Sequence, residues 1–272
     1  MPTVDVTLLT DHRYVDPKEL TPYVRNILQE DGLVLQALQA FGLKVERKDW
    51  ADPNYDWSQT RTALFRTTWD YFHRFAAFSD WLDHVESRTT LINPITQIRW
   101  NMDKRYLLEL EAKGVPIVQT QLLEAGTKTN LQALHEDLGW QDTVLKPAVS
   151  GGGRHTYRLH PGNYQAHENV FQQLLAEEAL LLQPFQRNIV EKGELSLILI
   201  DGQYSHAVLK VAKPGDFRVQ DDFGGSVHVY TPTAEEIQFA EAAIAACDPQ
   251  PLYARVDMAT DNEDRLAIVE LE

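Results

Sequence analysis

The spacing of apolar and polar positions divides the first hundred residues into alternating strands and helices. Residues 4–9 alternate and then run apolar, which predicts a strand, and residues 33–41 are apolar at helical spacing up to Gly42. A second strand begins at residues 44–46. Further predictions are strands at 63–65 and 91–92, an aromatic helix at 71–85, and a polar loop at 10–22. This β-α-β opening indicates an α/β lobe that ends near Asn93.

The rest of the pattern predicts antiparallel hairpins with a few helices. A helix at 103–113 stops at Gly114, and Thr233 with Glu236 has the capping-box spacing of a helix start. Strands at 195–200 and 204–211 flank an Asp-Gly turn, and those at 253–258 and 266–271 flank a polar turn. Strands are also expected at 143–148 and 179–185. Helices mixed with hairpins favour an α+β fold over one doubly wound sheet.

Composition and charge narrow the class of protein. A chain of 272 residues with 43% hydrophobic and 24% charged residues is typical of a globular protein with more than one lobe. Its net charge of -15 would repel a phosphate backbone, so nucleic acid is not an expected partner. We expect no membrane partner either and a cytoplasmic location, because no apolar run is long enough and no signal peptide opens the chain.

The single cysteine limits another kind of chemistry. Cys247 alone excludes an intrachain disulfide and a thiolate-rich metal site, which fits a reducing compartment. No histidine stands close to it in the sequence, so we interpret it as a small buried residue near a helix end.

A glycine-rich stretch follows the strand expected at 143–148. Ser150, Gly151, Gly152 and Gly153 can bring backbone N–H groups close to phosphate oxygens, because glycine has no side chain in the way. Glycine-rich turns are common, so this stretch alone decides little. Lys146 adds to it, since a lysine between apolar strand residues is expected to face a cleft or an anion. The spacing fits neither a Walker motif nor GxGxxG.

Carboxylates gather on the closing hairpin. Asp257 lies on one strand, Glu270 and Glu272 lie on its partner, and residues two apart face the same side of a sheet. Such oxygen ligands suit Mg²⁺, although a solvated acidic surface would show the same residues. Arg255 should share this face and is suited to bind an oxyanion.

Taken in order along the chain, these residues resemble the ATP-grasp superfamily. Lys104 in Asn-Met-Asp-Lys resembles the first phosphate lysine, and Lys146 with residues 150–153 resembles the second lysine and its mobile loop. Gln183 and Phe185 are similar to the segment whose backbone binds adenine, and Glu194 has the position of the ribose-binding carboxylate. Two further cations, Lys210 and Arg218, match positions that face the triphosphate and the substrate.

The closing hairpin carries the most specific part of the resemblance. Arg255-Val-Asp257 and Val-Glu270-Leu-Glu272 resemble the strand pair that holds two Mg²⁺ ions, although Asn often stands where this chain has Glu272. Phrases around Arg66, Trp69 and Asp70 and at 98–101 and 202–206 resemble the glutathione-synthetase-like branch, which includes the D-cycloserine-forming ligase.

The resemblance implies a clamp of three lobes. Residues 1–100 would form the N-terminal α/β lobe on the substrate side, 101–182 the central lobe with the glycine-rich loop, and 183–272 the C-terminal lobe with the metal site. The expected cofactors are ATP and two Mg²⁺ ions, with Mn²⁺ as the alternative metal. Substrate specificity would lie in the loops at 10–22 and 216–225.

The implied reaction is ligation. A substrate carboxylate would be phosphorylated by ATP and then attacked by an amine, with Arg255, Arg218 and Lys210 stabilising the transferred group. Small amino-acid-like molecules are the expected substrates, and a homodimer is compatible with this picture. Two alternatives stay open: a ligase that modifies a peptide or protein, and, since members usually continue a few residues past Glu272, a nucleotide-binding module without turnover.

Overall fold

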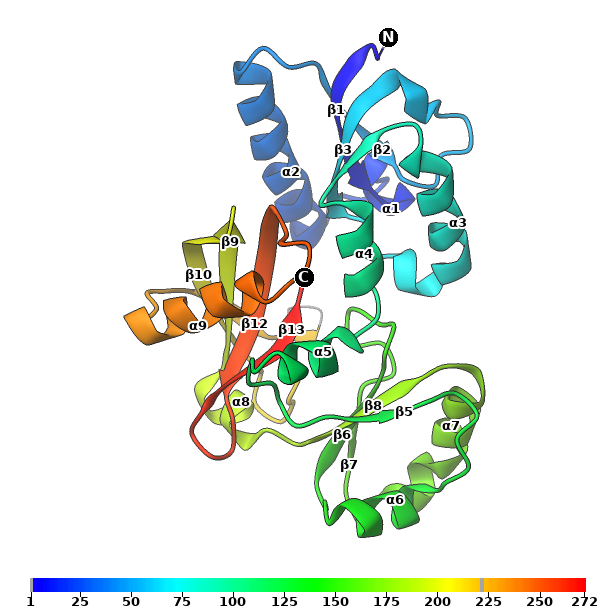
Figure 1. Cartoon of the computed structure of the whole chain (residues 1–272), viewed down its shortest axis with the longest axis vertical. Coiled ribbons are helices and arrows are strands. Elements are labelled where there is room, and N and C mark those ends of the chain that lie inside the picture. The colour runs from blue at the N-terminus through cyan, green and yellow to red at the C-terminus, as the bar shows by residue number, and fades with distance from the viewer. Residues whose placement is uncertain (1, 221–222) are drawn as a thin grey trace. The chain divides into compact units, whose positions relative to one another are not determined.

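The computed structural model describes residues 2–220 and 223–272, so Asp221 and Asp222 of the expected specificity loop lie outside the described residues. The chain forms two compact units, Met1–Ile98 and Arg99–Glu272 (Figure 1). The further division of the second unit at residue 182 stays a prediction.

The first unit contains a parallel four-stranded sheet in the order β2-β1-β3-β4. Its strands are β1 (Val4–Thr10), β2 (Val45–Asp49), β3 (Thr60–Thr67) and β4 (Thr90–Ile92). Its helices are α1 (His12–Val15), α2 (Pro22–Ala40) and α3 (Phe75–Glu86), with 3-10 turns η1 (Trp57–Gln59) and η2 (Tyr71–His73); α4 (Ile95–Asn101) crosses the boundary between the units. Helix α1 corrects the expectation of a continuous loop at 10–22: Asp11 caps its first turn by accepting from the Arg13 N–H.

The second unit contains two antiparallel sheets. The four-stranded sheet has the order β5-β8-β6-β7, and the five-stranded sheet has the order β11-β10-β9-β12-β13. The first is built from β5 (Gln121–Leu123), β6 (Thr143–Pro147), β7 (Tyr157–Leu159) and β8 (Leu180–Pro184). The second is built from β9 (Glu194–Ile200), β10 (Gln203–Val211), β11 (Ser226–Tyr230), β12 (Tyr253–Thr260) and β13 (Leu266–Leu271). The helices are α5 (Tyr106–Ala112), α6 (Leu131–Leu138), α7 (Tyr164–Glu177), α8 (Arg187–Lys192) and α9 (Ala234–Ala245).

Strand alternation gives the four-stranded sheet one face that packs against helices and a second face that carries polar side chains together with the buried Leu181. Leu145, Leu159 and Leu182 share a core with residues of α6 and α7. The intervening positions point to the other side, because successive side chains of a strand alternate. Lys146 and Gln183 therefore lie on the opposite face from this core.

The five-stranded sheet has the same division. Leu195, Leu197, Leu199 and Val256 are buried with residues of α5 and α9 in one core. Glu194 and Ser196 alternate with these leucines, and the pairings Lys210↔Glu194, Asp257↔Ser196 and Asp257↔Glu270 continue the polar row across four strands. The sheet register thus brings together residues that lie far apart in the sequence.

Candidate functional site

A buried carboxylate stands in the middle of the polar row. Asp257 is 3% exposed. Its oxygens accept hydrogen bonds from Ser196 Oγ at 2.5 Å, Lys210 Nζ at 2.9 Å and Arg255 Nε and Nη2 at 2.8 and 2.7 Å. Lys210 Nζ also donates to Glu194 Oε1 at 3.2 Å. The structure therefore brings together four of the sequence-predicted residues and adds Ser196.

Burial and neighbouring charges act in opposite directions on these groups. Burial would raise the pKa of Asp257, but Arg255 and Lys210 hold it well below its usual range. Burial raises the pKa of Glu194 to about 7, and the Lys210 ammonium reduces that shift. Burial would lower the pKa of Lys210, whereas Asp257 and Glu194 raise it above its ordinary value. The positive charges of Arg255 and Lys210 therefore stabilise the ionised carboxylates of this cluster.

Two further lysines of the second unit belong to the same site: Lys104 in the turn before α5, and Lys146 on β6. Lys104 is 4% exposed, and its Nζ lies 2.5 Å from the carbonyl oxygen of Ser150 and 2.9 Å from Glu270 Oε1. Lys146 is 9% exposed, and its ammonium group makes no hydrogen bond or ion pair with any described residue. Burial lowers its pKa, while Glu270 acts in the opposite direction. A buried cation without a partner is a strong indication of an anion site.

The three carboxylates predicted to bind metal are each paired with a cation. Asp257 bonds to Arg255 and Lys210, Glu270 contacts Lys104, and Glu272 Oε1 lies 2.7 Å from Arg255 Nη2. Within residues 2–220 and 223–272, no three His, Cys, Asp or Glu side chains form a ready metal cluster. Their oxygen donors fit Mg²⁺ chemically, but binding it requires these ion pairs to rearrange.

The glycine-rich loop lies beside residues of the loop before β11. Gly152 and Gly153 have φ values of 55° and 70°, in the region that favours glycine. A Cβ on Gly153 would stand 2.7 Å from the Phe223 ring and 3.8 Å from Arg218 Cδ. Arg218 itself bonds to Asp216 at 3.0 and 2.8 Å and stacks on Phe223. It therefore lies next to the glycine-rich loop, and among the described residues it makes no hydrogen bond or ion pair with Lys210 or Asp257.

The segment predicted to bind adenine carries a stack that sequence reasoning missed. Arg158 forms a two-point bond with Asp142 at 2.9 and 2.6 Å, and its guanidinium lies 3.6 Å from the centroid of the Phe185 ring. Phe217 meets the same ring at 5.8 Å. Gln183 Nε2 donates to Thr120 Oγ1 at 2.8 Å. In the hairpin of β6 and β7, Arg158 pairs with Val144, which lies two residues before Lys146 and on the same face of the sheet. The register of this hairpin could therefore have identified Arg158.

Two family models match the chain. The model for the D-cycloserine synthetase DcsG N-terminal domain matches residues 6–93, and the model for the prokaryotic glutathione synthetase ATP-grasp domain matches residues 109–251. The cycloserine biosynthesis protein DcsG of Streptomyces lavendulae is 30% identical over 258 residues, which cover 88% of this chain and 84% of that protein. The chain belongs to the ATP-grasp ligases. It is an ATP-dependent ligase with an α+β fold of the glutathione-synthetase-like branch.

Solved ATP-grasp structures agree with this assignment. The crystal structure of D-cycloserine synthetase DcsG is similar with a TM-score of 0.83 and 27% identity, covering 98% of this chain and 90% of that one. D-alanine–D-alanine ligase from Bacillus anthracis shares the fold at a TM-score of 0.67 and 13% identity, covering 99% and 86%. The ATP-grasp ligase PsnB, solved with a minimal precursor, shares it at 0.63 and 16%, covering 99% and 90%. Enzymes of this family use ATP with Mg²⁺ in general.

No helix in the described part of this ATP-grasp ligase is both long and apolar enough to cross a membrane. Cys247 is buried at 5% exposure, and burial raises the pKa of its thiol to about 11. A thiol held protonated in this way is a poor nucleophile, which agrees with its interpretation as a packing residue.

Proposed function

We propose that this ligase joins a small amino-acid-like carboxylate to an amine through an acyl-phosphate intermediate. The observation that carries the proposal is Lys146, a buried ammonium without a partner on the polar face of its sheet. A phosphate oxygen of ATP would supply the missing negative charge. The cycloserine and D-alanine names of two similar proteins support an amino-acid-like substrate.

The nucleotide would use residues from both sheets of the second unit. Lys104, Lys146 and the backbone of residues 150–153 would bind phosphate oxygens, since the lysines are buried and the glycines leave N–H groups accessible. Gln183 and Phe185 would border adenine, and Glu194 would accept from the ribose hydroxyls. Arg158, stacked on Phe185, would form part of the same wall.

Asp257, Glu270 and Glu272 would bind two Mg²⁺ ions, and Mn²⁺ would be able to replace them. Bound there, the metal would neutralise charge on the β- and γ-phosphates. Lys104, Lys210 and Arg255, which neutralise these carboxylates in this structure, would then become available to other anions. Arg255 and Lys210 are therefore the cations best suited to contact the transferred phosphoryl group.

The chemistry then follows from charge placement. An oxygen of the substrate carboxylate attacks the γ-phosphorus, the bond from this phosphorus to the ADP oxygen breaks, and an acyl phosphate forms. The amine attacks the acyl carbon, phosphate leaves with the bonding electron pair, and the amine loses a proton to solvent. Arg255, Lys210 and Arg218 would stabilise the oxyanions of both steps by positioned positive charge.

The first experiment is a titration of Mg-ATP by calorimetry into the wild type, Lys146→Met and the matched control Lys128→Met, whose parent residue is exposed. We expect Lys146→Met to bind at least about tenfold more weakly, as for loss of a charge-assisted hydrogen bond, and Lys128→Met to bind normally. Wild-type ADP release with a panel of amino acids and short peptides would identify the substrate class. Equal binding by all three proteins would contradict the proposed phosphate site, and ADP release with peptides alone would contradict the small substrate.

A further inference from the structure

The closing strand β13 carries Glu270 with Leu271 and Glu272 directly after it, and this strand forms an edge of its sheet. The backbone of Glu272 exchanges two hydrogen bonds with that of Arg255, at 2.6 and 2.9 Å. Neighbouring residues of a strand direct their N–H and C=O groups to opposite sides. The backbone groups of Leu271 therefore point away from β12, to the side where the described sheet ends.

Two side chains supply the partners that a further strand would have given. The Tyr106 hydroxyl accepts a hydrogen bond from the Leu271 N–H at 2.8 Å and donates one to the Leu271 carbonyl oxygen at 3.2 Å. Asn101 Nδ2 donates to the same oxygen at 2.9 Å. A hydroxyl can serve both backbone groups because it is a donor and an acceptor. Tyr106 and Leu271 are 1% and 4% exposed, so loss of the hydroxyl would leave a buried N–H without an acceptor.

The same short segment of chain also contacts Glu270 and the glycine-rich loop. Lys104 Nζ lies 2.9 Å from Glu270 Oε1 and donates to the Ser150 carbonyl oxygen at 2.5 Å. The Lys104 backbone N–H donates to the Ala148 carbonyl oxygen at 2.9 Å. Residues 101–106 therefore connect β13 with the loop that follows β6.

A bulge in the closing hairpin increases the importance of this support. Asp257 pairs with Glu270 and Met258 pairs with Ile268, which leaves Val269 as an extra residue on β13. A bulge disrupts the hydrogen-bond ladder locally. The backbone around Glu270 therefore depends more on the bonds at its outer side than a regular strand would.

We propose that Tyr106 and Asn101 are positioning residues, which fix the backbone of Leu271 and thereby the spacing of the two carboxylates beside it. This role rests on the proposed function, in which both carboxylates bind Mg²⁺. Metal ligands need to be held within about 0.5 Å of the productive geometry. The cations paired with the carboxylates would turn to the phosphates of bound nucleotide, whereas the uncharged hydroxyl and amide stay with the backbone.

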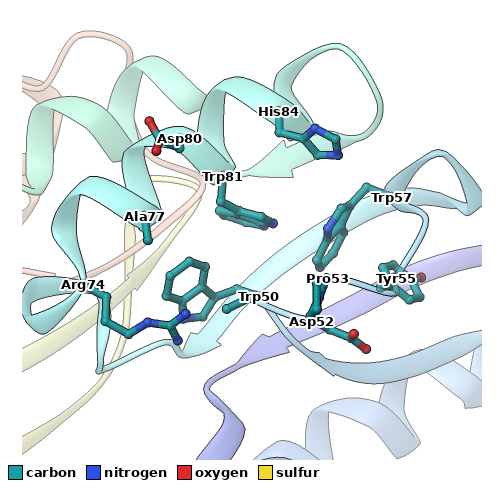
Figure 2. Close-up of a pocket in the computed structure, with 11 residues that line it drawn as sticks. Trp50, Asp52, Pro53, Tyr55, Trp57, Arg74, Ala77, Asp80, Trp81 and His84 are labelled. Carbon is teal, nitrogen blue, oxygen red and sulfur yellow. The ribbon is translucent and has the colours of Figure 1, made fainter.

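Two other tyrosines provide matched controls, because each loses a hydroxyl hydrogen bond when it is changed to phenylalanine. Tyr164 on α7 donates to the Gln141 carbonyl oxygen at 2.8 Å. Tyr55 bonds to Thr7 Oγ1 at 3.1 Å in the first unit. It also lines the tryptophan pocket of that unit, a cavity of about 360 Å³ named here after Trp50, Trp57 and Trp81 (Figure 2). Both controls therefore change hydroxyl bonds that do not involve β13.

The first measurement needs no ligand. Hydrogen exchange of the ¹⁵N-labelled, nucleotide-free full chain reports how firmly the Leu271 amide is held. In Tyr106→Phe we expect this amide to exchange about tenfold faster relative to the amides of β9, which report on opening of the whole sheet. In Tyr164→Phe and Tyr55→Phe the ratio should stay at the wild-type value.

The second measurement is calorimetric binding of AMP-PNP, a non-hydrolysable ATP analogue, over a series of free Mg²⁺ concentrations. Tyr106→Phe should raise the Mg²⁺ concentration that gives half of the full affinity about tenfold. Asn101→Ala removes one of two donors to the Leu271 carbonyl and should raise it about threefold. Glu270→Gln removes a proposed ligand and should raise it at least as much as Tyr106→Phe, and the two tyrosine controls should match the wild type.

Glu270→Gln separates the positioning role from the metal site. The positioning role is overturned, and the metal site survives, if the Leu271 amide keeps its wild-type exchange ratio in Tyr106→Phe or if Glu270→Gln alone changes the Mg²⁺ requirement. An unchanged requirement in Glu270→Gln overturns the metal role of the carboxylates and the positioning role with it. If Tyr106→Phe does not fold, Asn101→Ala decides the question, and a wild-type Mg²⁺ requirement in that variant overturns the positioning role.

Discussion

The pKa of Glu194 depends on its burial and on its neighbour Lys210. It is 7% exposed, and burial raises the pKa of its carboxyl to about 7, although Lys210 counteracts this. In the unfolded chain this carboxyl would ionise near its ordinary pKa of 4.5. Between these two values the folded chain binds more protons at this position than the unfolded chain, so the free energy of unfolding falls as pH rises through this window.

We therefore expect Glu194→Gln to remove part of this pH dependence. Between pH 5 and pH 7 the wild type should lose about 1 to 3 kcal/mol of stability relative to the variant. Urea unfolding of both proteins at the two pH values measures the difference. Parallel stability profiles would show that Glu194 titrates normally in the folded chain.

Asp257 makes the opposite contribution, because two cations and a hydroxyl hold it in its charged form. Asp257→Asn leaves Arg255 and Lys210 short of negative charge in a buried setting, so we expect a loss of about 3 kcal/mol at pH 7. Glu263→Gln is the surface control, since Glu263 is 69% exposed in its pair with Arg265, and its effect should stay within about 0.5 kcal/mol. Similar midpoints of urea unfolding for both variants would contradict the structural role of the Asp257 cluster.

Lys146 stands apart, because it makes no hydrogen bond or ion pair with any described residue and Glu270 offsets its burial only in part. Lys146→Met should make the nucleotide-free protein more stable, by about 1 kcal/mol or more, while it weakens ATP binding. Thermal unfolding without and with Mg-ATP would measure both effects. A variant that is less stable without nucleotide would mean that the ammonium is compensated in solution.

At the scale of elements, hairpins and caps were predictable because their signals are local. The turn between β9 and β10 and the closing hairpin β12-β13 follow from alternation and turn residues, and their register places Asp257 opposite Glu270. Edge strand β11 was not predicted, because its five residues are few and mostly exposed, although Val227 and Val229 do alternate with polar residues. The Lys104–Glu270 ion pair and the Arg158–Phe185 contact could not be predicted, because each joins segments that are distant in sequence.

The start of α9 tests one such local signal. Thr233 Oγ1 accepts from the Glu236 N–H at 3.2 Å, and the Glu236 side chain accepts from the Thr233 N–H at 2.7 Å. Thr233→Ala should lower the free energy of unfolding by about 1 kcal/mol, while Thr231→Ala, at an exposed position two residues earlier, should have little effect. Denaturant midpoints that do not separate the two variants would show that the capping box contributes nothing measurable.

At the scale of the whole molecule, the proposed ATP residues all belong to the second unit, whereas the tryptophan pocket belongs to the first. Mg-ATP at a hundred times its dissociation constant should stabilise the unit it binds by about 2.7 kcal/mol. Hydrogen exchange should therefore slow in β6, β9 and β12 of the second unit. Protection confined to β1–β4 would contradict the assignment of nucleotide residues.

The pairing of every proposed metal carboxylate with a lysine or arginine has a consequence for the order of events. Free Mg²⁺ would have to compete against ammonium and guanidinium groups that are tethered to the site and cannot diffuse away. Bound nucleotide would favour Mg²⁺ in this competition, because its phosphates attract the lysine and arginine side chains and free the carboxylates to bind the metal. Metal and ATP should therefore bind together, and changes in free Mg²⁺ concentration should have no effect on the nucleotide-free enzyme.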